Sequence, residues 1–331
     1  MTYIKLRNGS YINFSYFLFQ KIYHEQRINY IRIRKKFYDF FNKSGDKVLR
    51  PIVIWIEPTN NCNLKCIFCS HGNKSLTRKK GFMDYNLYKK IIDEVSVWRP
   101  SLYLHGIGEP LLHRKIIDMI KYARLKKCAF LHLTTNGMLL NDKLSEKLAN
   151  SGLDFLRFSV DSISRDYHKR VKVNSDLDKV VSNIENFIKI KGENKAKRPQ
   201  VGVSMVCTKE NKNKIGPFIK KFKNIGVDFI FMNHIHNWAG LLGSNKLRVK
   251  RPNYICWHPW YFSTVTWDGY LLPCCHDANA RYKIGNISKN KLLDVWDNNK
   301  MQFLRKCLKN GKSEKIPLCR NCDSLFVSNK E

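Results

Sequence analysis

Long apolar runs and signals for export are both missing from this chain of 331 residues. No stretch comes near the roughly 18 apolar residues that a transmembrane helix requires. The run YINFSYFLF at residues 11–19 follows Lys5 and Arg7, but Asn13 and Ser15 interrupt it and no small-residue cleavage site follows. We therefore expect no transmembrane segment and a cytoplasmic protein, in which cysteines are free thiols or metal ligands.

Acidic residues are also scarce, since 27 of them stand against 60 lysines and arginines, for a formal charge of +33. A charge this large invites a nucleic-acid interpretation. However, the basic residues are spread along the whole chain, and we recognise no RNA- or DNA-binding module in it. We attribute the charge to biased composition and expect no specific nucleic-acid partner, while anionic substrates and a membrane surface stay open.

What the chain does have, from residue 51 onward, is a regular alternation of short apolar runs with amphipathic segments. The alternation predicts an α/β fold with a parallel sheet and right-handed crossovers. Six strands are too few for a closed eight-stranded barrel, so we predict a partial (β/α)6 barrel with its ligand site at the carboxyl ends of the strands. The predicted strands are residues 52–58, 102–105, 129–134, 155–160, 201–206 and 227–232, and the predicted helices are residues 85–97, 115–126, 143–150, 176–190 and 212–223.

Three regions follow from these patterns. Residues 1–50 are a basic, mostly helical extension with a helix near residues 17–42, which either packs on the main domain or serves as a docking arm. Residues 51–240 form the barrel. Residues 250–331 form a small Cys-rich domain with a hairpin at Asp268-Gly269 and a helix near residues 292–308.

The stretch NNCNLKCIFCSHG, directly after the first predicted strand, holds Cys62, Cys66 and Cys69 at spacing C-x3-C-x2-C. A cysteine zinc site usually has four protein ligands. A cubane [4Fe–4S] cluster also needs one ligand per iron, so three thiolates leave one iron open. An open iron can chelate a small molecule, which suggests a catalytic cluster.

Other motifs stand at the ends of the next strands. HGIGEP (residues 105–110) follows the second strand, TTNG (134–137) follows the third, and FSVDS (158–162) closes the fourth. Together with the three cysteines, these motifs resemble the radical S-adenosylmethionine (radical SAM) superfamily, and the resemblance covers about residues 51–235. It implies a [4Fe–4S] cluster whose open iron is chelated by the methionine part of SAM.

The resemblance also implies contacts to SAM. Gly106 and Gly108 would present backbone, and Glu109 its carboxylate, to the methionine ammonium in a charge-assisted contact. Phe68 would pack near the adenine. Taken singly, the glycines could form a plain turn and Phe68 could belong to the core.

Three further residues receive a SAM contact from the same resemblance. Ser159 and Asp161 would contact the ribose or the carboxylate, and Asn136 would line the site. Asp161 alone could equally cap a helix. The coincidence of all these residues at consecutive strand ends is what supports the assignment.

A second set of cysteines, Cys256, Cys274, Cys319 and Cys322, forms a C-x17-C-x44-C-x2-C frame. By itself such a frame is a common structural zinc site. The surrounding WDGYLLPCC, IGNI, LLDVW and LCRNC resemble the C-terminal SPASM extension of radical SAM enzymes, in the shorter form called twitch. The resemblance implies one auxiliary [4Fe–4S] cluster with all irons ligated, and we interpret the adjacent Cys275 as a bystander.

The function implied by the resemblance is that of a radical SAM oxidoreductase, most like a dehydrogenase. Reductive cleavage of SAM would yield a 5′-deoxyadenosyl radical that abstracts hydrogen from a sugar-like or peptide substrate, and the auxiliary cluster would accept an electron. Flavodoxin or ferredoxin would be the electron-donating partner. Two alternatives stay open: a peptide maturase or epimerase with Cys207 as hydrogen donor, and a zinc-containing nucleic-acid-binding protein without catalysis.

Overall fold

The structure of this chain is a computed structural model, which divides into two units, Met1–Val48 and Leu49–Glu331. In the first unit, strands β1 (Tyr3–Lys5) and β2 (Tyr11–Asn13) pair antiparallel. The helix expected near residues 17–42 lies outside the described residues. The residues that the structure describes are 3–5, 11–13, 50–242, 248–250, 256 and 258–328.

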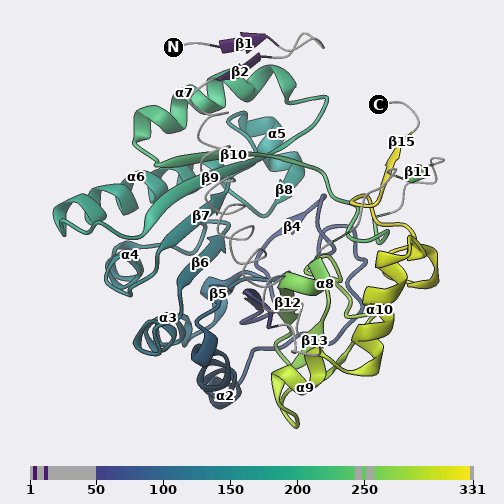
Figure 1. The fold of residues 1–331 in the computed structure, drawn as a ribbon. Coiled ribbons are helices and arrows are strands. Elements are labelled where there is room, and N and C mark those ends of the chain that lie inside the picture. The colour runs from purple at the N-terminus through teal and green to yellow at the C-terminus, as the bar shows by residue number, and fades with distance from the viewer. Residues whose placement is uncertain are drawn as a thin grey trace. The chain divides into compact units, whose positions relative to one another are not determined.

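The second unit is built on a nine-stranded sheet with the order β10-β9-β7-β6-β5-β3-β12-β13-β14 (Figure 1). From β10 to β3, every strand pairs parallel with its neighbour. The six predicted strands are therefore present, and with their crossover helices they form a partial (β/α)6 barrel. Their bounds are β3 (Val53–Ile56), β5 (Ser101–Tyr103), β6 (Phe130–Thr135), β7 (Phe155–Ser159), β9 (Gln200–Cys207) and β10 (Phe229–His234).

Helices line the outer face of the parallel sheet (Figure 1). Local capping sets where several of them begin: the side chains of Asp84, Asn141 and Asp176 each accept hydrogen bonding from the backbone of the first turn of the helix that follows. The five expected crossover helices are α2 (Tyr85–Val95), α3 (Ile116–Leu125), α4 (Asp142–Ala149), α6 (Leu177–Glu193) and α7 (Ile215–Ile225). A further helix, α5 (Arg165–Val171), was not predicted from the sequence.

The two faces of the parallel sheet carry different side chains, because successive residues of a strand point to opposite faces. On β7, Leu156 and Phe158 belong to the apolar core beneath the helices, so Phe155, Arg157 and Ser159 face the inside of the barrel. Aromatic rings pack on this inner face. The ring centroids lie 4.7 Å apart for Trp55 and Tyr103, 4.6 Å for Tyr103 and His132, and 5.1 Å for His132 and Phe155.

The C-terminal segment extends the same sheet. β12 (Phe262–Val265) pairs parallel with β3, and β13 (Tyr270–Leu272) and β14 (Gly285–Asn286) follow antiparallel. The predicted hairpin between β12 and β13 is confirmed, and its Gly269 has a φ of +84°, a left-handed conformation that favours glycine. The sequence thus predicted the hairpin but not its pairing with the barrel.

The helix predicted over residues 292–308 is two helices, α9 (Leu292–Trp296) and α10 (Asn299–Lys309). Asn298 separates them because its side chain accepts a hydrogen bond from the Met301 amide and so caps α10. The remaining elements here are α8 (His258–Tyr261) and the antiparallel pair β11 (Arg248–Lys250) and β15 (Phe326–Ser328). Within the described part of the chain, we find no helix with the length and apolarity that a membrane crossing requires.

Candidate functional site

The three cysteines of the first motif, hereafter the cysteine loop (Cys62, Cys66 and Cys69), lie between β3 and α2 at the carboxyl edge of the parallel sheet. All three are free thiols and half-buried. The pKa of Cys62 is raised to about 12, chiefly by burial, and the charges of Glu109, Cys66 and Cys69 act in the same direction. Burial likewise raises the pKa of Cys66 to about 11. Three neighbouring thiols with raised pKa values become thiolates when a metal group supplies compensating positive charge, so this donor set fits an iron-sulfur cluster.

A buried lysine faces the cysteine loop, and no pattern in the sequence pointed to it. Cys66 belongs to β4 (Lys65–Cys66), which pairs antiparallel with β8 (Lys172–Val173), so that Cys66 lies opposite Lys172. The Lys172 side chain is 2% exposed. Burial by itself would lower the pKa of its ammonium, but the Asp161 carboxylate and the Cys66 thiol raise it above its usual range. The ammonium therefore places a fixed positive charge beside thiols that would be anionic in a cluster.

Lys172 also joins two residues expected to contact SAM. Its Nζ donates to Asp161 Oδ2 at 3.1 Å, to Ser159 Oγ at 3.1 Å and to the Ser159 carbonyl. Asp161 has a left-handed backbone with a φ of +67°, and its Oδ1 accepts a hydrogen bond from the Val206 amide at 3.0 Å. These contacts tie the end of β7 to β9 and β8, whereas the N-cap position of the nearby α5 is held by Ser164. Asp161 thus does not cap that helix.

Two glycines allow the loop after β5 to pack on the cysteine loop. A β-carbon on Gly108 would lie 2.3 Å from the Thr59 carbonyl oxygen and 2.5 Å from that of Asn61. A β-carbon on Gly106 would lie 2.8 Å from Glu57 Cγ. The close approach of the loop after β5 to residues 57–61, just before the first cysteine, therefore favours glycine at both positions, in addition to any contact with a ligand.

Glu109 is 3% exposed, and protein donors take most of the hydrogen-bond acceptor positions of its carboxylate. Oε1 accepts hydrogen bonds from the Leu111 amide at 3.1 Å and the Thr135 hydroxyl at 2.7 Å, and Oε2 accepts one from the Asn136 amide at 2.7 Å. Burial raises the pKa of Glu109, while these three hydrogen bonds act in the opposite direction. A carboxylate has about four acceptor positions, so one remains for a ligand's ammonium group.

Asn136 links the end of β6 to the cysteine loop as well. Its side-chain amide donates to Asn63 Oδ1 at 2.8 Å, and its own Oδ1 accepts a hydrogen bond from the Met138 amide at 3.0 Å. Asn63 directly follows Cys62. Asn136 therefore lies at the expected edge of the sheet, where it holds the first residues of the cysteine loop in place.

Phe68 is half-buried within the cysteine loop, and its carbonyl accepts a hydrogen bond from Trp238 Nε1 at 2.9 Å. Trp238 follows β10 and has a φ of +51°, an unusual conformation for a bulky side chain. The preceding Asn237 donates its side-chain amide to the Asn321 carbonyl at 2.7 Å. The segment after β10 thus bridges the cysteine loop and the C-terminal turn that contains Cys319 and Cys322.

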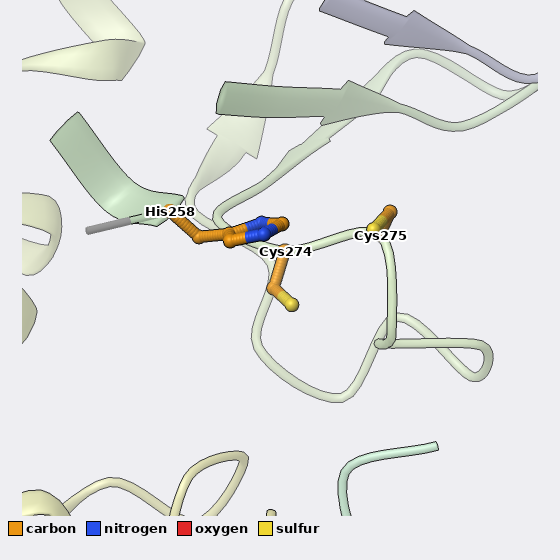
Figure 2. Close-up of side chains that lie close together, drawn as sticks. All are labelled: His258, Cys274 and Cys275. Carbon is orange, nitrogen blue, oxygen red and sulfur yellow. The ribbon is translucent and has the colours of Figure 1, made fainter. Parts of the chain in front are cut away.

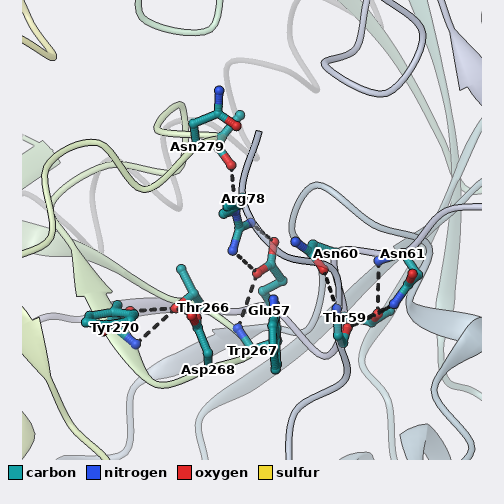
Figure 3. A network of polar contacts seen from close by, with 12 residues as sticks. Glu57, Thr59, Asn60, Asn61, Arg78, Thr266, Trp267, Asp268, Tyr270 and Asn279 are labelled. Carbon is teal, nitrogen blue, oxygen red and sulfur yellow. Dashed lines mark hydrogen bonds and ion pairs between the residues drawn. The ribbon is translucent and has the colours of Figure 1, made fainter. Parts of the chain in front are cut away.

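A buried ion pair makes a second connection between the region of the cysteine loop and the C-terminal region (Figure 3). Glu57, which is 2% exposed, accepts both ends of the Arg78 guanidinium, with Nη1 to Oε2 at 2.8 Å, and Oε2 also accepts from the Trp267 amide at 3.2 Å. Arg78 Nε donates to the Ala278 carbonyl at 2.7 Å. A bidentate, buried pair of this kind is geometrically restrictive. It fixes the strand before the cysteine loop and the segment after it against the C-terminal region.

The second group of thiols, hereafter the C-terminal cysteine set (Cys256, Cys274, Cys319 and Cys322), also converges. The pKa of Cys256 is raised to about 12 and that of Cys319 is also raised, in both cases chiefly by burial; the charges of Cys274 and Cys322 act in the same direction on both thiols. The pKa of Cys322 is raised by burial and then by Cys274. Four thiols from three separate segments of the chain are therefore close enough to act on one another, as ligands of one metal group must be.

Cys275, expected to be a bystander, lies directly beside this set (Figure 2). The sulfurs of Cys274 and Cys275 and a ring nitrogen of His258 lie within 4.8 Å of one another. A hydrogen bond with Cys275 is the largest cause of the raised pKa of Cys274, followed by burial. The sequence did not draw attention to His258, because it lies in α8, whereas its two cysteine neighbours lie in the loop after β13.

Cys207 lies at the end of β9, on the face of the strand that carries Val203 and Met205. Those two residues are buried in the core beneath the helices, whereas Ser204, on the opposite face, pairs in register with Ser159. The Cys207 sulfur is 3.7 Å from Met232 Sδ on the neighbouring strand. Strand alternation thus directs the thiol away from the inner face of the barrel, which disfavours hydrogen donation to a substrate there.

A partial parallel barrel with three clustered cysteines after its first strand defines a fold class, and sequence comparison agrees with it. A family model described as the radical SAM superfamily matches residues 56–228, and one described as an iron-sulfur cluster-binding domain, SPASM, matches residues 256–323. The chain belongs to the radical SAM superfamily and carries a C-terminal SPASM domain. Its cofactors are accordingly a [4Fe–4S] cluster with SAM in the barrel and auxiliary iron-sulfur in the SPASM domain.

Two curated relatives are similar over most of their length. The tungsten-containing aldehyde ferredoxin oxidoreductase cofactor-modifying protein of Pyrococcus furiosus is 26% identical, with 81% of this chain and 86% of that protein covered. The S-adenosyl-L-methionine-dependent 2-deoxy-scyllo-inosamine dehydrogenase of Niallia circulans is 26% identical, with 84% of this chain and 95% of that protein covered.

Solved structures show the same fold. BtrN in complex with AdoMet and 2-DOIA superimposes with a TM-score of 0.59 at 23% identity and covers 87% of this chain and 98% of its own. Streptococcus suis SuiB bound to S-adenosylmethionine gives a TM-score of 0.66 at 17% identity and covers 92% of this chain and 81% of its own. At these identities the likeness concerns the fold alone.

Proposed function

We propose that this protein is a radical SAM oxidoreductase that dehydrogenates a sugar-like substrate. The observation that carries the proposal is the convergence of the C-terminal cysteine set at a site joined to the cysteine loop through Trp238 and Arg78. A cluster ligated by four thiolates has no open iron for a substrate, so electron transfer is its natural use. The similarity to a SAM-dependent dehydrogenase over 84% of the chain supports the same reaction class.

When bound at the cysteine loop, a reduced [4Fe–4S] cluster and SAM supply the 5′-deoxyadenosyl radical that takes a hydrogen atom from a substrate carbon. In this proposal Cys62, Cys66 and Cys69 hold three irons, and their partial burial limits access of water. The free acceptor position of Glu109 binds the methionine ammonium. The Lys172 ammonium offsets the negative charge of the thiolates.

The substrate would lie over the inner face of the barrel, where Ser159 ends β7 and Ser204 lies beside it on β9. Hydrogen abstraction would leave a carbon radical, which must lose one electron and the proton of its hydroxyl group to complete a two-electron oxidation. The C-terminal cysteine set would hold the cluster that accepts it. The chain's main contribution is therefore rigid positioning of two cofactors, for which the Glu57–Arg78 pair and the Trp238–Phe68 hydrogen bond provide the connections.

Anaerobic reconstitution followed by turnover with aminocyclitols, beginning with 2-deoxy-scyllo-inosamine, tests the proposal. The protein should carry about eight irons and form one 5′-deoxyadenosine per oxidised substrate, since two cubanes hold four irons each. The double variant Cys319→Ala/Cys322→Ala should still cleave SAM but give no oxidised product. The matched control Cys128→Ala, which removes a core thiol beneath α3, should behave as wild type.

Three outcomes would contradict the proposal. Bound zinc with no iron after reconstitution would exclude this enzyme class. An inverted substrate carbon that carries solvent deuterium would indicate an epimerase. Turnover only on a peptide, with no aminocyclitol or sugar oxidised, would indicate a maturase.

A further inference from the structure

A third group of ligand-type side chains lies outside both cysteine groups. One ring nitrogen each of His236 and His276 and a carboxylate oxygen of Asp323 lie within 4.8 Å of one another. The two imidazole centroids are 4.8 Å apart, and His236 Nδ1 is 3.6 Å from Asp323 Oδ2. The three residues come from separate segments: the one after β10, the loop after Cys274 and the turn at Cys322. Convergence of two imidazoles and a carboxylate is a donor set that divalent transition metals use.

The backbone around these residues is held by reciprocal hydrogen bonds. The Asn237 amide donates to Asp323 Oδ2 at 2.7 Å, and the Asp323 amide donates to Asn237 Oδ1 at 3.2 Å. The Asn237 side chain also donates to the Asn321 carbonyl. His236 and Asp323 are thus brought together by their neighbours, and their proximity does not depend on the 3.6 Å contact between their own side chains.

One carboxylate oxygen of Asp323 takes no part in these hydrogen bonds. Oδ2 accepts the Asn237 amide, whereas Oδ1 is buried and has no hydrogen-bond partner among the described residues. Buried polar atoms are nearly always satisfied, and a carboxylate oxygen without a partner is especially costly. A cation bound beside the two imidazoles would satisfy it.

The spacing suits a metal ion after small side-chain movements. Zinc bonds to nitrogen and oxygen of about 2.0–2.1 Å in tetrahedral geometry place ligand atoms about 3.3 Å apart. From the present spacing, each ligand atom needs to move inward by at most about 0.8 Å to reach that geometry. His236 is 50% exposed and has room to adjust.

We propose that His236, His276 and Asp323 bind one divalent transition-metal ion of the zinc type, separate from the two clusters. Three protein ligands leave a coordination position open, as in zinc sites that bind a further small ligand. This proposed metal site stands whether or not the protein is a dehydrogenase. It assumes only that both cysteine groups are occupied by iron-sulfur clusters.

Zinc binding to the reconstituted full-length protein tests this site. After both clusters are formed, loosely held metal is removed with a chelator, Zn²⁺ is added under anaerobic conditions, and zinc and iron are counted in the desalted protein. We expect one zinc per chain with the iron count unchanged. His236→Ala and Asp323→Asn should each weaken zinc binding at least 100-fold, since even second-shell changes cost 10- to 100-fold. The matched control His234→Ala, which removes an exposed histidine at the end of β10, should keep the zinc.

Several results would overturn the proposal. Absence of the extra zinc in wild type would do so directly. Zinc that persists in His236→Ala and Asp323→Asn but disappears in Cys275→Ala would belong to the neighbouring group of Cys274, Cys275 and His258. Zinc that rises only as iron falls would lie on the cysteines in place of a cluster.

Discussion

Replacing Lys172 with methionine removes one partner of a buried ion pair at nearly constant side-chain length. The side chains of Lys172 and Asp161 are 2% and 8% exposed. Loss of one partner from such a pair costs about 3–5 kcal/mol, because the other charge is left buried without compensation. Asp161 keeps the hydrogen bonds from the Ser159 hydroxyl and the Val206 amide, so we expect a loss of about 3 kcal/mol, at the lower end of that range.

Anaerobic thermal unfolding of the reconstituted protein measures this loss. In a chain of this size 1 kcal/mol shifts Tm by about 2 °C, so Lys172→Met should lower Tm by roughly 6 °C. Asp161→Asn/Lys172→Met should recover part of the loss, because neither charge then remains. Lys169→Met, an exposed lysine on the neighbouring α5, is the matched control and should leave the free energy of unfolding within about 0.5 kcal/mol of wild type.

The same variant has an electrochemical consequence. The Lys172 ammonium stabilises negative charge beside Cys66, so its loss should lower the reduction potential of the SAM-binding cluster, as followed by redox titration with EPR detection. Strictly additive stability losses in the double variant would show that Lys172 is not coupled to Asp161. A reduction potential equal to that of wild type would show that Lys172 does not act on the cluster.

Three further predictions concern the candidate site. Gly108→Ala should weaken SAM binding and lower iron content, because its β-carbon would meet the Thr59 carbonyl at 2.3 Å; Gly216→Ala on α7, where nothing lies within 4 Å, should change neither quantity in the same binding and iron assays. Glu109→Gln should lower SAM affinity in a binding titration while the iron content stays at the wild-type value, since the carboxylate is no iron ligand; equal affinity would mean that the loop after β5 does not contact SAM. Cys207→Ala should keep most of the turnover with an aminocyclitol, because the thiol faces the helices; loss of product in this variant would restore the hydrogen-donor role.

Much of the fold could be predicted from local sequence patterns. The runs that became β3, β6, β7 and β9 are recognisable because each strand buries a row of apolar side chains beneath the helices, such as Leu156 and Phe158 of β7. The crossover helices followed from their amphipathic pattern, and the hairpin followed from Asp268-Gly269. The candidate cysteines could be named for the same reason, because the spacing of the first three ligands within one loop is itself a local property.

The face of a strand on which a side chain lies was harder to predict from the sequence. The position of Cys207 at a strand end suggested the active edge of the barrel, but the edge does not determine the face. The register of β9 with β7 places Ser204 beside Ser159 on the inner side and leaves Cys207 with Met205 on the outer side. Register is a property of the paired strands and cannot be deduced from either strand alone.

The sequence by itself determined the order of strands and helices, the thiols available to each metal group and the glycines in the loop after β5. Only the tertiary structure decided that β12 extends the barrel sheet beside β3, that Lys172 lies against Cys66, and that Glu57 and Arg78 join the two regions. These contacts link segments far apart in the chain, and a single lysine or arginine among 60 basic residues leaves no periodic signal. The partner of each of these side chains is decided by folding, because a charge that is buried away from water is stable only when it is paired.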